Sequence, residues 1–199
     1  MTELIPAPTF DSSFPHNWTA EILRARPLIL PSRHYVYPGQ VEEVERGALE
    51  ILIRPGGEQN LPDGQSFLAT CALGFRDSVV PTGLWTMPHP DWLCAVAGGY
   101  AYLIDTTHPG RFTMLSYRPV LSLLPYNPGP AGESLLLFVS HRTILAWGRD
   151  GQAWETAPLS SEGISSLCIE DSILHGLGWN LMTDSDTLFA LDLRTGKKL

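Results

Sequence analysis

Apolar residues occur in short runs along most of the chain, and each run ends at a cluster of glycine, proline, asparagine or aspartate. Residues 48–53 form one run, and residues 66–75 form a nearly continuous one that we expect to be buried on both faces. Runs of this length, bounded by turn residues, are typical of β-strands rather than helices. The pattern therefore predicts an all-β fold of short strands.

A strand–turn–strand pattern recurs three times, at residues 102–115, 143–154 and 188–199. The turns contain Gly110, Gly151 and Gly196, which are spaced at intervals of about 40 residues. Repeats of this length with about four short strands each are typical of β-propellers. The sequence predicts a propeller-like domain over 39–199, with a degenerate repeat at 39–80, repeats at 81–119 and 120–160, and an incomplete one at 161–199.

The best preserved copy is Ala190-Leu-Asp-Leu-Arg-Thr-Gly-Lys197. It resembles the turn between the third and fourth strands of quinoprotein-like and WD40-like propeller blades, which often reads Ala-x-Asp-x-x-Thr-Gly-Lys. Residues 102–110 and 146–151 are looser versions, so the resemblance covers residues 83–199. It implies a propeller-like stack of antiparallel sheets. No Gly-His and Trp-Asp pair recurs, and no residues match quinone or metal ligands, so the resemblance implies no cofactor.

Residues 1–38 contain six prolines and no clean periodicity. Because proline lacks a backbone donor, we expect an irregular arm that packs on the body, with no long helix and no central strand. A short helix is expected at 19–26, and extended pieces at 28–30 and 34–37. This arm could supply a strand to the degenerate repeat; alternatively the sheet stack stays open and the arm or a second copy of the chain covers its end.

Composition and charge limit the classes of binding partner that we expect. The net charge of −8 disfavours nucleic acid or an anionic membrane as the main partner and would suit a basic one. The N-terminus does not read as a signal peptide and no apolar run is long enough for a membrane helix, so we expect a cytoplasmic protein. Cys71, Cys94 and Cys168 each lie in an apolar run, and we expect buried free thiols.

The most conspicuous loop is residues 87–92, Met-Pro-His-Pro-Asp-Trp. Rigid prolines and aromatic rings lose little entropy on binding, which favours a binding loop; a tight turn with its tryptophans in the core is the alternative. Asp105 and His108 could pair, although an Asp in a turn often bonds the local backbone. The candidate binding residues are Trp85, His89, Asp91, Trp92, Asp105, His108 and Arg149.

Motifs for catalysis or metal binding are absent from the sequence. The six histidines lack zinc-site spacing, the glycine pairs lack the Lys-Ser/Thr of a phosphate loop, and no serine lies in Gly-x-Ser-x-Gly. We therefore expect no metal, no cofactor and a non-catalytic protein-binding or scaffold module, such as an inhibitor or immunity-type partner of a basic effector. The alternatives are a small-ligand binder or hydrolase-type enzyme that uses loops at the blade axis, and a structural subunit completed by homodimerisation.

Overall fold

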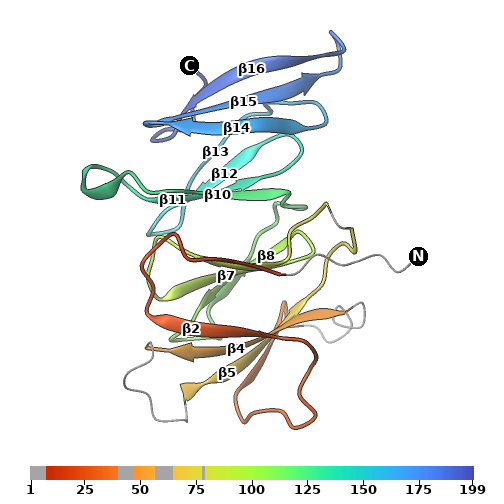
Figure 1. Cartoon of the computed structure of the whole chain (residues 1–199), viewed down its shortest axis with the longest axis vertical. Coiled ribbons are helices and arrows are strands. Elements are labelled where there is room, and N and C mark those ends of the chain that lie inside the picture. Colours follow the sequence, from red (N-terminus) through yellow and green to blue (C-terminus); the bar gives the residue numbers. More distant parts are fainter. Residues whose placement is uncertain (1–7, 40–46, 57–64, 78) are drawn as a thin grey trace. The chain divides into compact units, whose positions relative to one another are not determined.

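The computed structural model describes residues 8–39, 47–56, 65–77 and 79–199. The predicted all-β class is confirmed: strands form four small open sheets, and no α-helix occurs in these ranges (Figure 1). A 3-10 turn at Gly129–Ala131 (η2) interrupts the connection between two strands. None of the described helical segments has the length and apolar character of a membrane span. The chain divides into two compact units, Met1–Pro119 (unit 1) and Val120–Leu199 (unit 2).

The first sheet of unit 1 has the strand order β2-β4-β5-β3. Its strands are β2 (Trp18–Leu23), β3 (His34–Tyr37), β4 (Ala48–Pro55) and β5 (Phe67–Ala72). β4 pairs antiparallel with β2 and β5, whereas β3 runs parallel to β5. β5 is buried along its whole length, as expected from its continuous apolar run.

The second sheet of unit 1 has the order β1-β6-β7-β8-β9. Its strands are β1 (Thr9–Asp11), β6 (Gly83–Thr86), β7 (Trp92–Ala97), β8 (Tyr100–Asp105) and β9 (Phe112–Met114). β6 to β9 form an antiparallel meander, and β1 adds in parallel to β6. Gly98 and Gly99, both with positive φ, make the two-residue turn between β7 and β8. Two-residue hairpin turns often require positive φ at both positions, which glycine adopts without strain.

Three strands, β1, β2 and β3, come from the segment of residues 1–38, for which we expect an irregular arm. The expectation of irregular structure is wrong for β1 and β2. The expected helix at 19–26 is also wrong. In β2, Trp18, Ala20 and Ile22 alternate toward the core and the strand pairs with β4, so tertiary pairing overrides local helix preference. All three strands lie at sheet edges, where a proline-rich segment can still form strands.

The expected extended piece at 34–37 is confirmed as β3, but residues 28–30 do not lie over the body. Leu28 and Ile29 are fully or almost fully exposed. The segment of residues 8–39 is nevertheless held firmly at other points, since Phe14 and Trp18 are buried. The subdivision of 39–199 into four repeats stays a prediction, and residues 40–46, 57–64 and 78 of its first repeat lie outside the described ranges.

One apolar core joins the two sheets of unit 1. Its buried members come from β2 to β8. They are Trp18, Tyr37, Leu49, Ile51, Ile53, Phe67, Ala69, Cys71, Leu84, Leu93, Ala95, Ala97, Tyr102 and Ile104. Because β2 and β3 supply Trp18 and Tyr37, the N-terminal segment is part of this core.

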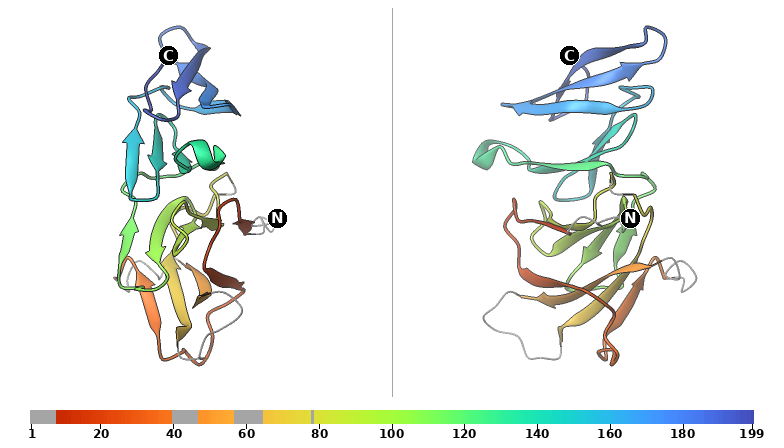
Figure 2. Two further views of the ribbon diagram at one scale, coloured as in Figure 1. Left: turned by 90° about the vertical axis from the view of Figure 1, so that its left-hand side faces the viewer. Right: turned by 45° about the vertical axis from the view of Figure 1, so that its right-hand side comes forward.

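Unit 2 holds two antiparallel meanders, each drawn from a continuous stretch of chain (Figure 2). The first contains β10 (Ser122–Tyr126), β11 (Leu135–Val139), β12 (Ile144–Trp147) and β13 (Gln152–Glu155). The second contains β14 (Ile164–Glu170), β15 (Ile173–Asn180) and β16 (Ser185–Asp192). Their shared core includes Leu137, Ile144, Leu174, Phe189 and Leu191.

The three cysteines are free, but they are not all buried. Cys71 and Cys94 are buried, and this burial raises the pKa of both thiols. Cys168 is exposed, so the expectation of burial is wrong there. It pairs with His175 in β15, whereas its neighbour Ile169 pairs with the core residue Leu174, so Cys168 falls on the opposite face of the sheet.

Candidate functional site

Two connections meet at one end of the β6–β9 meander. The β6–β7 connection spans residues 87–91 and the β8–β9 connection spans residues 106–111. Alternate connections of an antiparallel meander lie at the same end of the sheet, and Trp92 pairs directly with Asp105 across β7 and β8. The loop singled out in the sequence and the turn after Asp105 are therefore neighbours.

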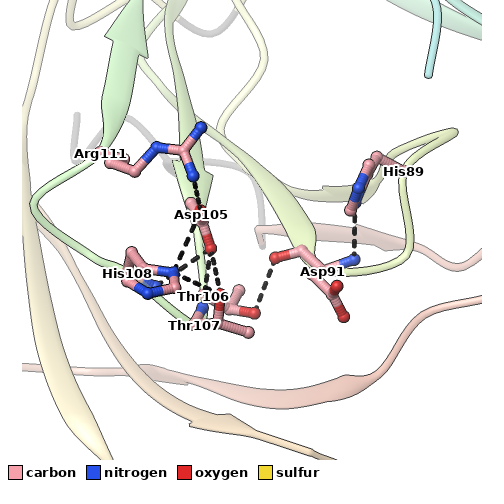
Figure 3. A network of polar contacts seen from close by, with 7 residues as sticks. All are labelled: His89, Asp91, Asp105, Thr106, Thr107, His108 and Arg111. Carbon is pink, nitrogen blue, oxygen red and sulfur yellow. Dashed lines mark hydrogen bonds and ion pairs between the residues drawn. The ribbon is translucent and has the colours of Figure 1, made fainter. Parts of the chain in front are cut away.

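A hollow of about 230 Å³ lies between these connections. Its lining is polar except for one indole, and the close-up in Figure 3 shows most of its side chains. The lining residues are His89, Asp91, Trp92, Asp105, Thr107, His108 and Arg111. Five of the seven candidate residues from the sequence thus surround one hollow.

Asp105, the last residue of β8, organises the β8–β9 turn. Its side chain is almost fully buried. Oδ1 accepts hydrogen bonds from the backbone N–H groups of Thr107 and His108, each at 3.0 Å, and from Thr107 Oγ1 at 2.7 Å. Oδ2 lies 3.3 Å from Arg111 Nη1. The carboxylate is thus committed to the turn and to the Arg111 guanidinium.

Burial of Asp105 acts to raise the pKa of its carboxyl, but the hydrogen bonds from Thr107 and the His108 backbone and the charge of His108 outweigh it. The pKa is therefore lower than the ordinary value. Asp105 remains ionised at neutral pH, and its negative charge holds the cationic Arg111 at the rim of the hollow.

Asp91 fixes the other connection and ties it to the N-terminal segment. Its backbone oxygen accepts bonds from the N–H and Oγ1 of Thr106, and its carboxylate accepts one from Asn17 Nδ2 at 2.9 Å. Its N–H donates to His89 Nδ1 at 3.2 Å, which uses the lone pair of that nitrogen and leaves His89 Nε2 as the remaining donor.

The outward-facing groups of the hollow are mostly donors. The side chains of His108 and Arg111 are each 71% exposed, whereas that of Asp105 is 5% exposed. Trp92 is half-buried, and its backbone oxygen accepts a bond from the Trp18 indole, which fixes the strand beneath it. The hollow thus exposes the His108 imidazole, the Arg111 guanidinium and the Trp92 indole. The carboxylates of Asp91 and Asp105 already accept hydrogen bonds from the protein itself.

Two candidate residues lie elsewhere. Trp85 is buried in β6, opposite Cys94 in β7. This burial agrees with the alternative interpretation, in which the tryptophans of this region belong to the core. Arg149 belongs to the exposed β12–β13 turn of unit 2 and does not line the hollow. Sequence reasoning missed Thr107 and Arg111. The Asp-Thr-Thr signal for a local turn points to Thr107, but no signal in the sequence pairs Arg111 with Asp105.

The same turn geometry occurs after β16. Asp192 Oδ1 accepts bonds from the backbone N–H groups of Arg194 and Thr195, and Asp192 Oδ2 lies 3.5 Å from Arg194 Nη2. In both turns a strand-terminal Asp bonds the N–H groups two and three residues later and pairs with a nearby arginine. The Asp105 turn differs because its carboxylate is buried.

The carboxylates of the hollow have little capacity for a metal ion. Within the described ranges, no group of three or more His, Cys, Asp or Glu side chains could hold a metal ion. The Asp105 oxygens are occupied by turn donors and Arg111, which leaves little capacity for a further ligand.

We expect Asp105→Asn to lower the free energy of unfolding by about 1.5–3 kcal/mol at pH 7, because the acceptor of the turn hydrogen bonds loses its charge and the ion pair with Arg111 is removed. The folded pKa lies below the unfolded value of about 3.9, so this contribution is full above that pH and disappears as the pH falls through the folded pKa. Urea titrations from pH 7 to 2.5 should show the gap between wild type and variant closing. Asp192→Asn, at the exposed equivalent turn, is the control with a smaller effect, and a gap that stays constant at low pH would contradict this account.

No model of a known protein family matches the chain, and no curated protein shows significant similarity to it.

Proposed function

We propose that this protein is a non-catalytic binding module that recognises another protein through the hollow between the β6–β7 and β8–β9 connections. The observation that carries the proposal is the convergence of five sequence-selected side chains, His89, Asp91, Trp92, Asp105 and His108, around one open polar hollow. Arg111 adds a cation at the rim. Arginine and tryptophan are the residue types most enriched at the energetic centres of protein interfaces.

The geometry favours binding over acid–base catalysis. A proton-transfer pair needs heavy atoms about 2.6–3.2 Å apart, whereas His108 Nδ1 lies 3.7 Å from Asp105 Oδ2. The lowered pKa of Asp105 also makes its carboxylate a poor proton acceptor near neutral pH. The pair therefore serves to orient donors toward a partner.

The size of the hollow favours a side chain of a protein partner over a free metabolite. Small-molecule sites typically enclose about 300–1,000 Å³, whereas this hollow has about 230 Å³ and is bordered by exposed side chains. His108, Arg111 and His89 Nε2 can donate to a carboxylate, amide or backbone oxygen that enters it. The net charge of −8 would steer a basic partner toward the protein, as for an inhibitor or immunity-type protein.

The binding surface would belong to a propeller-like repeat architecture. Support comes from three antiparallel meanders in succession, β6–β9, β10–β13 and β14–β16, and from the matching aspartate turns after β8 and β16. Repeats of this kind commonly present their connections for recognition, which is an argument from fold alone.

The test is capture of a partner from lysate of the native host at low salt by tagged protein. We expect a protein retained by the wild type to be lost at least tenfold with Arg111→Ala and with Trp92→Ala, since such residues carry about 2 kcal/mol or more at interface centres. Arg142→Ala, which removes an exposed arginine of unit 2, should retain it. Melting temperatures establish that each variant is folded.

Capture that is unchanged in both hollow variants would refute the proposal. A thermal-shift response to a metal, nucleotide or sugar that Arg111→Ala abolishes would instead support the small-ligand alternative. A solution mass of two chains would support the homodimer alternative.

A further inference from the structure

The outer edge of β16 is only partly paired. Near its end, Lys197–Leu199 adds a short antiparallel segment: Leu191 bridges Lys198, Asp192 N donates to Lys197 O at 3.0 Å, and Leu199 N donates to Ala190 O at 2.9 Å. The backbone groups of Ala190 and Asp192 thus point away from β15.

The backbone N–H and C=O groups of Asp186 and Leu188 also point away from β15, because these groups alternate sides along a strand. Asp186 is opposite Trp179, whose own N–H and C=O bond Gly163 and Ser161 on the far side of β15. Among the described residues, nothing pairs with the outward N–H and C=O groups of Asp186 and Leu188. An open edge of this kind is a template for another strand.

Exposed apolar side chains accompany this edge. Leu188 is 77% exposed, and the β15–β16 turn carries Leu181 and Met182, which are 63% and 93% exposed. An incoming strand would cover Leu188 as it bonded the backbone beside it. The edge therefore offers both parts of strand addition, namely main-chain hydrogen bonds and a side-chain contact.

The protein's own pairing shows which chemistry this edge accepts. The register of the Leu191–Lys198 bridge places Lys197 opposite Asp192 and Leu199 opposite Ala190, a basic residue against an acid and an apolar residue against an apolar one. The vacant part offers the same two kinds of residue in the reverse order, since Leu188 and Asp186 precede Ala190 on the same face of the strand. An antiparallel strand would match it with an apolar residue opposite Leu188 and a basic one opposite Asp186.

A second copy of the chain fits this edge poorly. Antiparallel pairing of two β16 edges would bring Asp186 against the other Asp186, or against Leu188 or Ala190, depending on register. Like charges in direct opposition, or a charge against an apolar residue, disfavour strand pairing. Acidic residues at an edge are also a common device against self-association.

We propose that the Asp186–Leu188 edge of β16 binds an extended segment of another protein in which an apolar and a basic residue stand two positions apart. This surface lies in unit 2 and does not depend on the hollow of unit 1.

The test uses a fluorescent six-residue peptide, Val-Leu-Thr-Lys-Val-Thr, titrated with the full chain and followed by anisotropy. We expect saturable binding that weakens at least tenfold when the peptide lysine is replaced by glutamate, and at least tenfold in Asp186→Lys. Binding of the glutamate peptide should improve in Asp186→Lys, because the charges are then complementary again.

The backbone contribution is tested by a matched pair of variants. Leu188→Pro removes the outward N–H at a position where an edge strand tolerates proline, whereas Leu188→Ala shortens the side chain and keeps the N–H. Leu188→Pro should abolish binding, while Leu188→Ala weakens it only a few-fold. Circular dichroism and melting temperatures show whether Leu188→Pro is folded. If it is not, hydrogen exchange on the wild type provides the test instead, and peptide should slow the exchange of the Asp186 and Leu188 amides.

The proposal is overturned if the peptide does not bind at millimolar protein, or if the peptide and protein charge reversals leave its affinity unchanged. It is also overturned if folded Leu188→Pro binds like wild type, or if peptide leaves exchange of the two amides unchanged. Because the readouts concern unit 2 alone, they succeed or fail independently of partner capture through Arg111 and Trp92.

Discussion

Replacing Trp18 with alanine is expected to lower the free energy of unfolding of unit 1 by about 3–5 kcal/mol, the usual cost of truncating a large buried aromatic side chain. Trp18 is 1% exposed and lies in the core shared by both sheets of unit 1. Its indole N–H also donates to the backbone oxygen of Trp92 at 3.1 Å, so the substitution loosens the strand beneath the hollow.

Urea denaturation followed by circular dichroism measures this effect. Phe10→Ala is the control from the same segment, because Phe10 is half-exposed and packs edge-on against Trp18; it should cost about 1 kcal/mol or less. A Trp18→Ala protein as stable as wild type would show that the N-terminal segment is an appendage rather than part of the core.

In unit 2, Leu191→Ala is expected to cost about 2–5 kcal/mol, whereas Leu188→Ala in the same strand should cost less than about 0.5 kcal/mol. Leu191 is fully buried in the core beneath β16, and Leu188 faces outward and is largely exposed. The two residues are the same type on one strand, so the comparison measures burial alone. Equal costs would mean that β16 has a different register from the one described.

The fold class could be predicted because its signals are local. Short apolar runs and turn clusters identify strands such as β5 and β8 without knowledge of their partners. β2 was misread for the opposite reason. Its residues, Thr-Ala-Glu-Ile-Leu, suit a helix, and only pairing with β4, about 30 residues later, makes them a strand.

In the candidate site, too, local sequence signals were readable and contacts made by chain reversal were not. The loop of His89 and Asp91 and the turn of Asp105 and His108 stand out in the sequence, and their proximity follows from the meander. Arg111 was missed because it meets Asp105 only after the intervening turn reverses the chain. The two tryptophans share one face of the sheet, since Trp85 pairs with Cys94 and Trp92 lies two residues before Cys94 in β7. They differ in position along the sheet: Trp85 is buried within β6, whereas Trp92 begins β7 at the rim of the hollow.

The exposure of Cys168 also depends on the tertiary structure around its strand rather than on its sequence neighbours. Its apolar neighbours suggest a buried strand, yet β14 is an edge strand, with Leu167 and Ile169 packed on the core and Cys168 facing outward. A short sequence window does not reveal whether a second layer covers the other face of a sheet.

Photo-crosslinking from the rim of the hollow tests directly whether the hollow binds a protein partner. A photo-reactive amino acid at position 108, whose side chain is 71% exposed, is irradiated in cells of the native host, with the same group at exposed position 142 as the control. We expect one discrete adduct from position 108 that is absent from position 142 and lost when Arg111→Ala is added. No adduct from position 108, or the same adduct from both positions, would contradict a partner-binding role for the hollow.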